Sequence, residues 1–271
     1  MATLIYKRLR YVFLMFIVFT LSACGTIKTV AYITPNPLPD REIKQIKLLL
    51  NVYPLKNPGP TIVYMHGCSG LDGVYLEWKN KLNDWGYNVV IPDSLRSRGV
   101  NSACARQGVA GVSHNDRLED LLETAKWIRT QSWHSGKIGV IGFSMGANAA
   151  MNLASNGGVL SSAKQDVYKN TLISAAAAYY PFCSAAHRSA TIPVLVLVGA
   201  ADTWTPPHSC AFIADANKNI ESIIYPDVHH SFDVAGLNQV NRHGHTVKYD
   251  AFAAGDAEKR TRVFFSKHLL N

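Results

Sequence analysis

Short apolar runs alternate with longer, mixed segments along most of the chain. Runs rich in branched and aromatic side chains predict buried strands at 61–66, 87–93, 137–141, 174–181, 193–198 and 220–225. The segments between them include predicted helices at 77–85, 115–128 and 147–155. The mixed apolar and basic stretch at 43–53 predicts an antiparallel edge strand. This alternation favours an α/β fold, with a mostly parallel twisted sheet covered by helices on both faces.

The most specific motif lies where the predicted strand 137–141 runs toward the predicted helix 147–155. Residues 142–146 read Gly-Phe-Ser-Met-Gly, with Ser144 at the centre. A serine on a sharp turn between strand and helix projects its hydroxyl above the sheet, and flanking glycines prevent Cβ clashes. The start of the helix adds backbone N–H groups near a developing oxyanion. We therefore predict Ser144 as a nucleophile; an ordinary glycine-rich turn is the alternative.

A second glycine-containing turn, His-Gly-Cys-Ser-Gly at 66–70, follows the predicted strand 61–66. Such a turn can offer one backbone N–H to an oxyanion, and the residue after the nucleophile can offer another. These donors are the N–H groups of Cys68 and Met145. We interpret His66 as a structural histidine that holds the turn, not as the catalytic base.

An aspartate and two histidines follow the last two predicted strands. Asp202 can accept the Nδ1 proton of a histidine, although a helix cap or turn aspartate is the alternative. His229 or His230 could in principle reach Ser144. The chain order serine, aspartate, histidine is that of α/β hydrolases.

Histidines close in sequence raise the alternative of a metal site. The set comprises His229, His230, His243 and His245. The sequence has neither a helical His-x-x-x-His pair nor a neighbouring set of carboxylates here. We therefore expect no metal at these histidines; hydrolysis by a serine, a histidine and an aspartate needs no organic cofactor either.

Together these motifs resemble the dienelactone hydrolase family of α/β hydrolases, from about residue 45 to the end. In that family the histidine stands two residues before a phenylalanine, which selects His230 over His229. The matching pieces are 66–68, 92–94 with 98–99, 142–146, 199–206, 225–226 with 230–232, and the closing segment 249–265.

The resemblance implies a serine hydrolase that cleaves a carboxylic ester or lactone through an acyl-enzyme. Ser144 would attack, His230 would take its proton, and Asp202 would orient His230. Founding dienelactone hydrolases use a cysteine nucleophile, so hydrolysis is implied but dienelactone is not. Arg98 lies near a family position that binds a substrate carboxylate, and we expect Arg98 and Trp204 to contact substrate. A solvated loop residue is the alternative for Arg98.

Four cysteines lie beyond residue 24, namely Cys68, Cys104, Cys183 and Cys210. Four cysteines allow three connectivities, and free buried thiols are also open. The fold of the resembled family implies the pairs Cys68–Cys104 and Cys183–Cys210.

The N-terminus predicts export. A basic start, a short apolar run and small residues describe a secretory signal, since the run is shorter than the ~20 residues of a membrane span. Leu-Ser-Ala-Cys at 21–24 resembles a bacterial lipobox, which predicts a signal peptide at 1–23 and lipidation of Cys24. We expect a tether at 24–41, a catalytic domain at 42–271, and a lipoprotein on the periplasmic side. Gly25 favours the outer membrane, and a cut near Ala23 without lipidation is the alternative.

The net charge of the chain argues only against nucleic acid as a partner. The formal net charge of +8 falls to +5 once three basic residues and no acidic ones leave with 1–23. The chain lacks basic runs interleaved with aromatics, so we expect no nucleic acid as partner. The expected partner is a small ester or lactone.

Two other functions stay open. They are a peptidase or acyltransferase on the same triad, and a non-catalytic binding lipoprotein. The segments 94–113 and 234–249 are candidates for a cap over the pocket.

Overall fold

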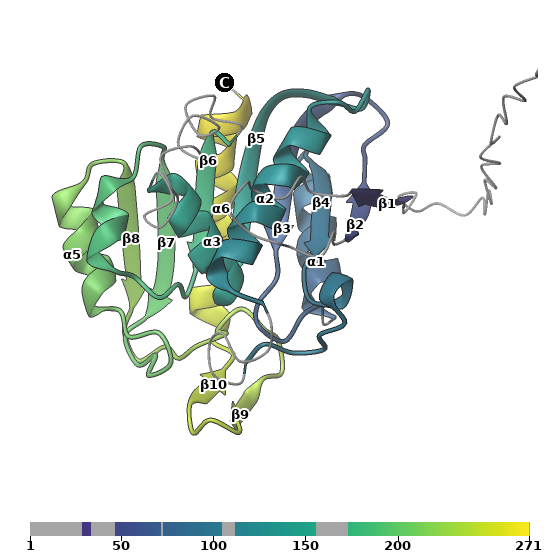
Figure 1. Cartoon of the computed structure of the whole chain (residues 1–271). Helices are drawn as coiled ribbons and strands as arrows, with labels where there is room; N and C mark the ends of the chain where they lie inside the picture. Colours follow the sequence, from purple (N-terminus) through teal and green to yellow (C-terminus); the bar gives the residue numbers. More distant parts are fainter. Residues whose placement is uncertain (1–28, 34–46, 72, 105–111, 156–172, 271) are drawn as a thin grey trace, which may run out of the picture.

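A computed structural model describes residues 29–33, 47–71, 73–104, 112–155 and 173–270. In these residues an eight-stranded sheet forms the centre of the molecule, in the order β1-β2-β4-β3-β5-β6-β7-β8 (Figure 1). All strands from β4 to β8 in this order pair in parallel, whereas β1–β2 and β2–β4 pair antiparallel. The strands are β1 Thr29–Ile33, β2 Leu48–Tyr53, β3 Gly59–Met65, β4 Asn88–Asp93, β5 His134–Phe143, β6 Ala175–Tyr179, β7 Val194–Gly199 and β8 Ile220–Tyr225.

Helices cover both faces of this sheet, which confirms the predicted α/β fold. The α-helices are α1 Val74–Asp84, α2 His114–Ile128, α3 Met145–Ala154, α5 His208–Ala216 and α6 Ala251–Phe265. On one face α2 packs beside α3. On the other, Lys81 of α1 forms a 2.8 Å ion pair with Glu258 of α6.

Short elements connect the main ones. The 3₁₀ helices are η1 Arg96–Arg98 and η2 Ala185–Ser189, a π-helical turn η3 at Ser266–Leu270 ends the described chain, and a hairpin is formed by β9 Asn238–Val240 and β10 Thr246–Lys248. The hairpin projects beyond the carboxyl ends of the parallel strands (Figure 1). Among the described residues, no helix combines the length and apolarity that crossing a bilayer requires.

The N-terminal part of the sheet differs from expectation. Strand β1 lies inside the stretch predicted as a tether and pairs with β2 from Thr29↔Val52 to Ile33↔Leu48. Because β1 occupies the outer position, β2 is antiparallel as predicted but is not the edge strand. The proposed signal peptide and Cys24 lie outside the described residues.

The central strand β5 lies in the core. Its residues 138–143 are buried, and α3 packs on it through small side chains such as Ala147 and Ala150. Small residues let the helix axis approach the sheet closely. This packing fixes the position of the turn between β5 and α3, where Ser144 lies.

Candidate active site

Ser144 occupies a strained turn between β5 and α3. Its φ of 51° and ψ of −114° lie in a region that non-glycine residues rarely adopt. A Cβ on Gly146 would lie 2.0 Å from the carbonyl oxygen of Met65, and one on Gly142 would lie 2.3 Å from that of Gly146. Only glycine therefore fits at either position, as the motif predicts for a nucleophile elbow.

Asp202 and His230 form a buried pair beyond the ends of β7 and β8. Oδ2 of Asp202 lies 2.7 Å from Nδ1 of His230, and the two residues are 2% and 1% exposed. Burial alone would raise the pKa of Asp202, but the hydrogen bond and charge of His230, with bonds from Thr205, hold that pKa below its usual range. Asp202 is therefore an ionised acceptor that fixes the imidazole, which leaves Nε2 free to act on a neighbouring hydroxyl.

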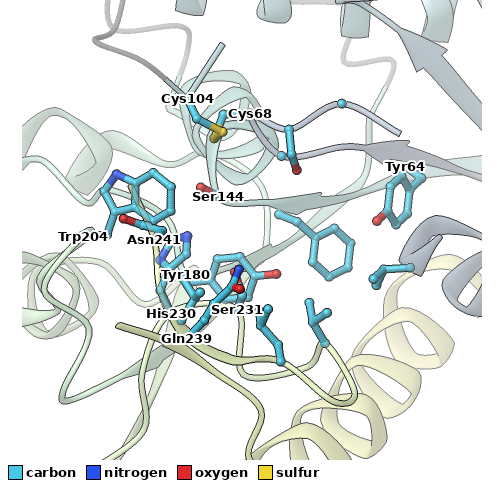
Figure 2. Close-up of a pocket in the computed structure, with 18 residues that line it drawn as sticks. Tyr64, Cys68, Cys104, Ser144, Tyr180, Trp204, His230, Ser231, Gln239 and Asn241 are labelled. Carbon is cyan, nitrogen blue, oxygen red and sulfur yellow. A yellow bond between two sulfur atoms is a disulfide. The ribbon is translucent and has the colours of Figure 1, made fainter. Parts of the chain in front are cut away.

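Ser144 and His230 line the same cavity, whose volume is about 310 Å³ (Figure 2). Figure 2 shows Ser144 between Trp204 at one end of the lining and Tyr64 at the other. Among the described residues the Ser144 hydroxyl has no hydrogen-bond partner, so it is available to a ligand in the cavity. Catalytic hydrogen bonds often shorten only when substrate binds.

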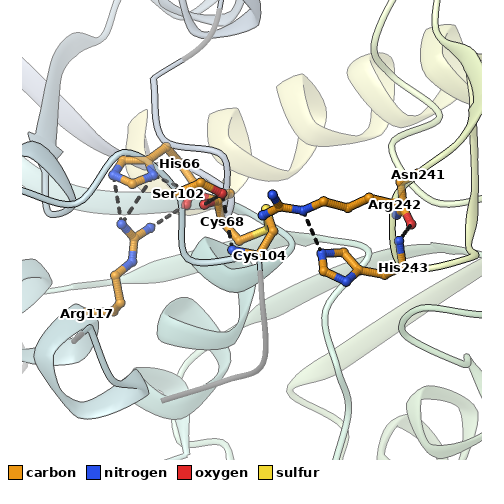
Figure 3. The surroundings of a disulfide bond; sticks show 9 residues. His66, Cys68, Ser102, Cys104, Arg117, Asn241, Arg242 and His243 are labelled. Carbon is orange, nitrogen blue, oxygen red and sulfur yellow. Dashed lines mark hydrogen bonds between the residues drawn. A yellow bond between two sulfur atoms is a disulfide. The ribbon is translucent and has the colours of Figure 1, made fainter. Parts of the chain in front are cut away.

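His66 holds the turn after β3 and does not line the cavity, in line with its predicted structural role. Its Nδ1 donates to the carbonyl of Gly67 at 2.7 Å, and its Nε2 accepts from Arg117 at 2.8 Å (Figure 3). Arg117 also donates to the His66 carbonyl. Burial, followed by the charge of Arg117, holds the pKa of His66 well below its usual range. A neutral histidine and a buried guanidinium thus brace this turn.

Of the two predicted oxyanion donors, Cys68 shares the cavity with Ser144, and Met145 directly follows Ser144 in the chain. Cys68 lines the cavity, and its carbonyl accepts from Ala103 N–H at 2.8 Å. Met145 begins α3, and its side chain is buried. Cys68 is bonded to Cys104, so the disulfide forms part of the cavity wall (Figures 2 and 3).

A second disulfide joins Cys183 and Cys210, outside the cavity lining. Both pairings are those that the family resemblance implies.

The two residues expected to contact substrate behave differently. Arg98 is not among the residues that line the cavity. Its guanidinium instead binds both carboxylate oxygens of Asp120, at 2.7 and 2.9 Å, with its side chain 9% exposed. Neither a substrate contact nor a solvated loop describes Arg98, because its charge is satisfied inside the protein. Trp204 does line the cavity and stacks on His245 with ring centroids 5.5 Å apart.

The segment after His230 supplies one side of the cavity. Its contributors are Ser231, Val234, Leu237, Gln239, Asn241 and Val247, from the predicted cap segment 234–249 and the residue after His230. From the other candidate, 94–113, only Cys104 lines the cavity among described residues, and 105–111 lie outside them. In the part of the chain that the structure describes, no three His, Cys, Asp or Glu side chains are grouped as metal ligands.

Three site residues were not found from the sequence. Thr205 donates to Oδ2 of Asp202 at 2.8 Å, and its backbone N–H donates to Oδ1 at 2.9 Å. Its spacing of three from an aspartate is a turn signature that could have indicated it. Tyr180 and Asp233 carry no such local signal, since tertiary packing brings them together.

Comparisons with known proteins agree with this fold. Residues 50–269 match the Dienelactone hydrolase family. No curated protein matches the chain. Among solved structures, the dienelactone hydrolase-like promiscuous phosphotriesterase P91 from metagenomic libraries has a TM-score of 0.66 at 18% identity, covering 90% of this chain and 100% of that one.

Two further similar structures are esterases. The Pyrococcus furiosus esterase Pf2001 gives a TM-score of 0.62 at 18% identity, covering 90% of this chain and 93% of that one. The carboxylesterase Cest-2923 from Lactobacillus plantarum gives 0.60 at 15% identity, covering 88% and 98%. At these identities the likeness establishes the fold.

Proposed function

Since the chain belongs to the dienelactone hydrolase family, we propose that it is a serine hydrolase that cleaves a carboxylic ester or lactone. The observation that carries this proposal is the buried Asp202–His230 pair, which faces the cavity that Ser144 enters from its strained turn. A carboxylate, a histidine and a hydroxyl in this arrangement are the parts of a nucleophilic acyl-transfer site.

The reaction proceeds in two halves. Oγ of Ser144 attacks the carbonyl carbon while its proton moves to Nε2 of His230, and Asp202 stabilises the imidazolium. The backbone N–H groups of Cys68 and Met145 bind the oxyanion. The C–O bond to the alcohol then breaks, and the alcohol leaves with the proton from His230. Water attacks the acyl-enzyme by the same route and restores Ser144.

The cavity favours a small substrate. A volume of about 310 Å³ is at the lower end of small-molecule sites. One part of the wall is apolar, with Phe143, Val74 and Leu237, whereas Gln239 and Asn241 add polar groups. We therefore propose short acyl esters or small lactones as the substrate class, with Trp204 as a contact.

The test is hydrolysis of p-nitrophenyl acetate and butyrate by the full chain. We expect turnover by the wild type and a fall of about 10³-fold or more in Ser144→Ala and His230→Ala. Ser189→Ala, on an exposed residue of η2, controls for loss of a serine. A folded but inactive wild type, or a Ser144→Ala variant with the wild-type rate, would overturn the proposal.

The same assay separates the alternatives. Faster cleavage of peptide p-nitroanilides than of esters would indicate a peptidase, and transfer to an added alcohol in preference to water would indicate an acyltransferase. Binding of an ester without turnover would indicate a non-catalytic carrier.

We also propose that the protein is an exported lipoprotein. The lipobox-like residues 21–24 support this, as do the two disulfides, which persist in oxidising compartments. Cys24→Ala should move the protein from the membrane fraction to the soluble fraction of cells. An unmodified Cys24 in the mature protein, found by mass spectrometry, would contradict lipidation.

A further inference from the structure

The ring of Tyr180 packs against the imidazole of His230. The two ring centroids lie 4.5 Å apart, and Tyr180 also lines the cavity. The residue follows β6 directly and has a φ of 42°, a left-handed conformation that is unusual for a bulky side chain. Its carbonyl oxygen lies 3.1 Å from the Thr205 hydroxyl, whose single proton it shares with Oδ2 of Asp202 at 2.8 Å. Tyr180 therefore contacts His230 through its ring and Thr205, a hydrogen-bond partner of Asp202, through its backbone.

Asp233 holds Tyr180 from the other side. The Tyr180 hydroxyl donates to Oδ1 of Asp233 at 2.8 Å, and Nε1 of Trp78 donates to Oδ2 at 2.9 Å. Burial raises the pKa of Asp233, and the bonds from Trp78 and Tyr180 partly offset that rise. This carboxylate therefore links α1 and the end of β6 to the segment that carries His230.

His230, Tyr180 and Asp233 form a closed chain of contacts. Asp233 lies three residues after His230, so the same segment is tied to Tyr180 by the carboxylate and touches its ring through the imidazole. Asp202 holds the imidazole at Nδ1. We infer that Asp233 is a positioning residue for the proposed hydrolase: anchored by Trp78, it fixes the imidazole of His230 through Tyr180, in the orientation that presents Nε2 to Ser144.

The geometry distinguishes this role from substrate binding. Asp233 does not line the cavity, so its loss should act on the orientation of His230 and not on substrate affinity. Both carboxylate oxygens accept from neutral donors, and an asparagine can accept at only one of them. With its oxygen still accepting from Trp78, the amide N–H₂ would turn toward the Tyr180 hydroxyl, so the charge-assisted bond from Tyr180 to the carboxylate is replaced by a weaker, neutral N–H···O bond.

A matched pair of adjacent tyrosines supplies the control. Tyr179 donates or accepts a 2.8 Å bond with Thr261 of α6, the same length as the Tyr180–Asp233 bond. Its ring packs on Phe143 and Phe232, and no ring contact with His230 is found among the described residues. Tyr179→Phe and Tyr180→Phe therefore each remove one hydroxyl bond, but only the second touches the proposed machinery.

The first readout is the steady-state rate with a short p-nitrophenyl ester. We expect kcat of Asp233→Asn and Tyr180→Phe to fall about tenfold, with the KM of Asp233→Asn within about twofold of wild type. The double variant should lose no more than the worse single variant, because both break one link. Wild-type kcat in Asp233→Asn, or an equal loss in Tyr179→Phe, would overturn the inference.

The second readout does not need turnover. Proton NMR of the full chain should show a downfield signal from the Nδ1–H of His230 bound to Asp202. We expect the signal to broaden or shift in Asp233→Asn and Tyr180→Phe and to remain in Tyr179→Phe. If Ser144→Ala kept the wild-type rate, the proposed function would fail, and this signal would still decide the positioning role. An unchanged signal in Asp233→Asn would overturn that role.

Discussion

The carboxylate of Asp202 is saturated by the groups around His230. Oδ1 accepts the backbone N–H groups of Trp204 and Thr205, at 2.8 and 2.9 Å, while Oδ2 accepts the Thr205 hydroxyl and faces Nδ1 of His230. The loop after β7 therefore fixes the Asp202 carboxylate, and the carboxylate in turn fixes the imidazole of His230. This arrangement holds the His230 ring in one orientation, with Nδ1 directed at Oδ2 of Asp202.

Asp202→Asn should lower kcat on esters by about 10⁴-fold, because an amide N–H₂ toward His230 favours the wrong tautomer. The matched control is Asp256→Asn, whose carboxylate accepts the Tyr225 hydroxyl at 2.9 Å away from the cavity. The measurement is kcat and KM for both variants. A loss of less than tenfold in Asp202→Asn would show that Asp202 is not the orienting acid.

Gly146→Ala should destabilise the protein and abolish hydrolysis. Its Cβ would lie 2.0 Å from the Met65 carbonyl oxygen, so the elbow must shift. We expect a loss of about 2 kcal/mol or more in the free energy of unfolding. The control, Gly255→Ala, places its Cβ in open space on α6 and should raise that free energy by up to about 1 kcal/mol.

Urea unfolding and ester hydrolysis of both glycine variants supply the measurement. If Gly146→Ala kept wild-type stability and rate, the close contact between the elbow and the end of β3 would be wrong.

Much of the fold could be predicted because it depends on local patterns. Buried parallel strands read as continuous apolar runs, and the sharp turn at Ser144 requires glycines that stand out in the sequence. Strand β1 could not be predicted in the same way, because the prolines that follow it resemble a linker and its strand conformation depends on pairing with β2. The cysteine pairs required the family resemblance, since spacing alone allows three connectivities.

The site was predictable only where chemistry and motif coincide. Ser144, Asp202 and His230 each follow a strand, and the structure brings them to one end of the sheet. The partner of Arg98 could not be predicted. A basic residue in a loop near a site suggests an anion contact, but its partner Asp120 lies in α2, 22 residues away. Neither side chain signals that partnership in the sequence.

Removing either disulfide should lower the free energy of unfolding by a similar amount, but only one of the two removals should lower kcat. The bonded cysteines are 36 residues apart for Cys68–Cys104 and 27 apart for Cys183–Cys210. Chain entropy predicts a loss on the order of 3–4 kcal/mol for each pair. Only the first pair adjoins Ser144, so Cys68→Ser with Cys104→Ser should also lower kcat.

The measurement compares the two double variants by urea unfolding and by ester hydrolysis, at a temperature where both remain folded. Equal rates of hydrolysis in the two variants would show that the Cys68–Cys104 disulfide does not affect the reaction.

Because of His187, the protein should be less stable in mild acid than at neutral pH. Burial lowers its pKa from 6.5 to about 4, while Nε2 bonds Oδ1 of Asn152 at 3.0 Å. Between these values the unfolded chain binds a proton that the folded protein excludes, so stability falls as pH falls from about 6.5 toward 4. The full effect of one such histidine is about 3 kcal/mol.

His187→Gln should flatten this decline, and His208→Gln, at an exposed position, should leave it unchanged. Urea unfolding at pH 7, 5.5 and 4.5 measures the slopes. A slope for His187→Gln as steep as that of the wild type would assign the acid sensitivity to other groups, such as His66, whose pKa is also lowered by burial.

The positive φ of Ser144 has a consequence for how this protein can change over generations. A strained backbone at a functional position costs on the order of 1–3 kcal/mol of folding stability, and glycine would relieve that cost at once. Under selection for robustness alone, position 144 would drift toward glycine and the hydroxyl would disappear. On the proposed function, the serine is kept at this position for its hydroxyl, at the expense of the stability that glycine would return.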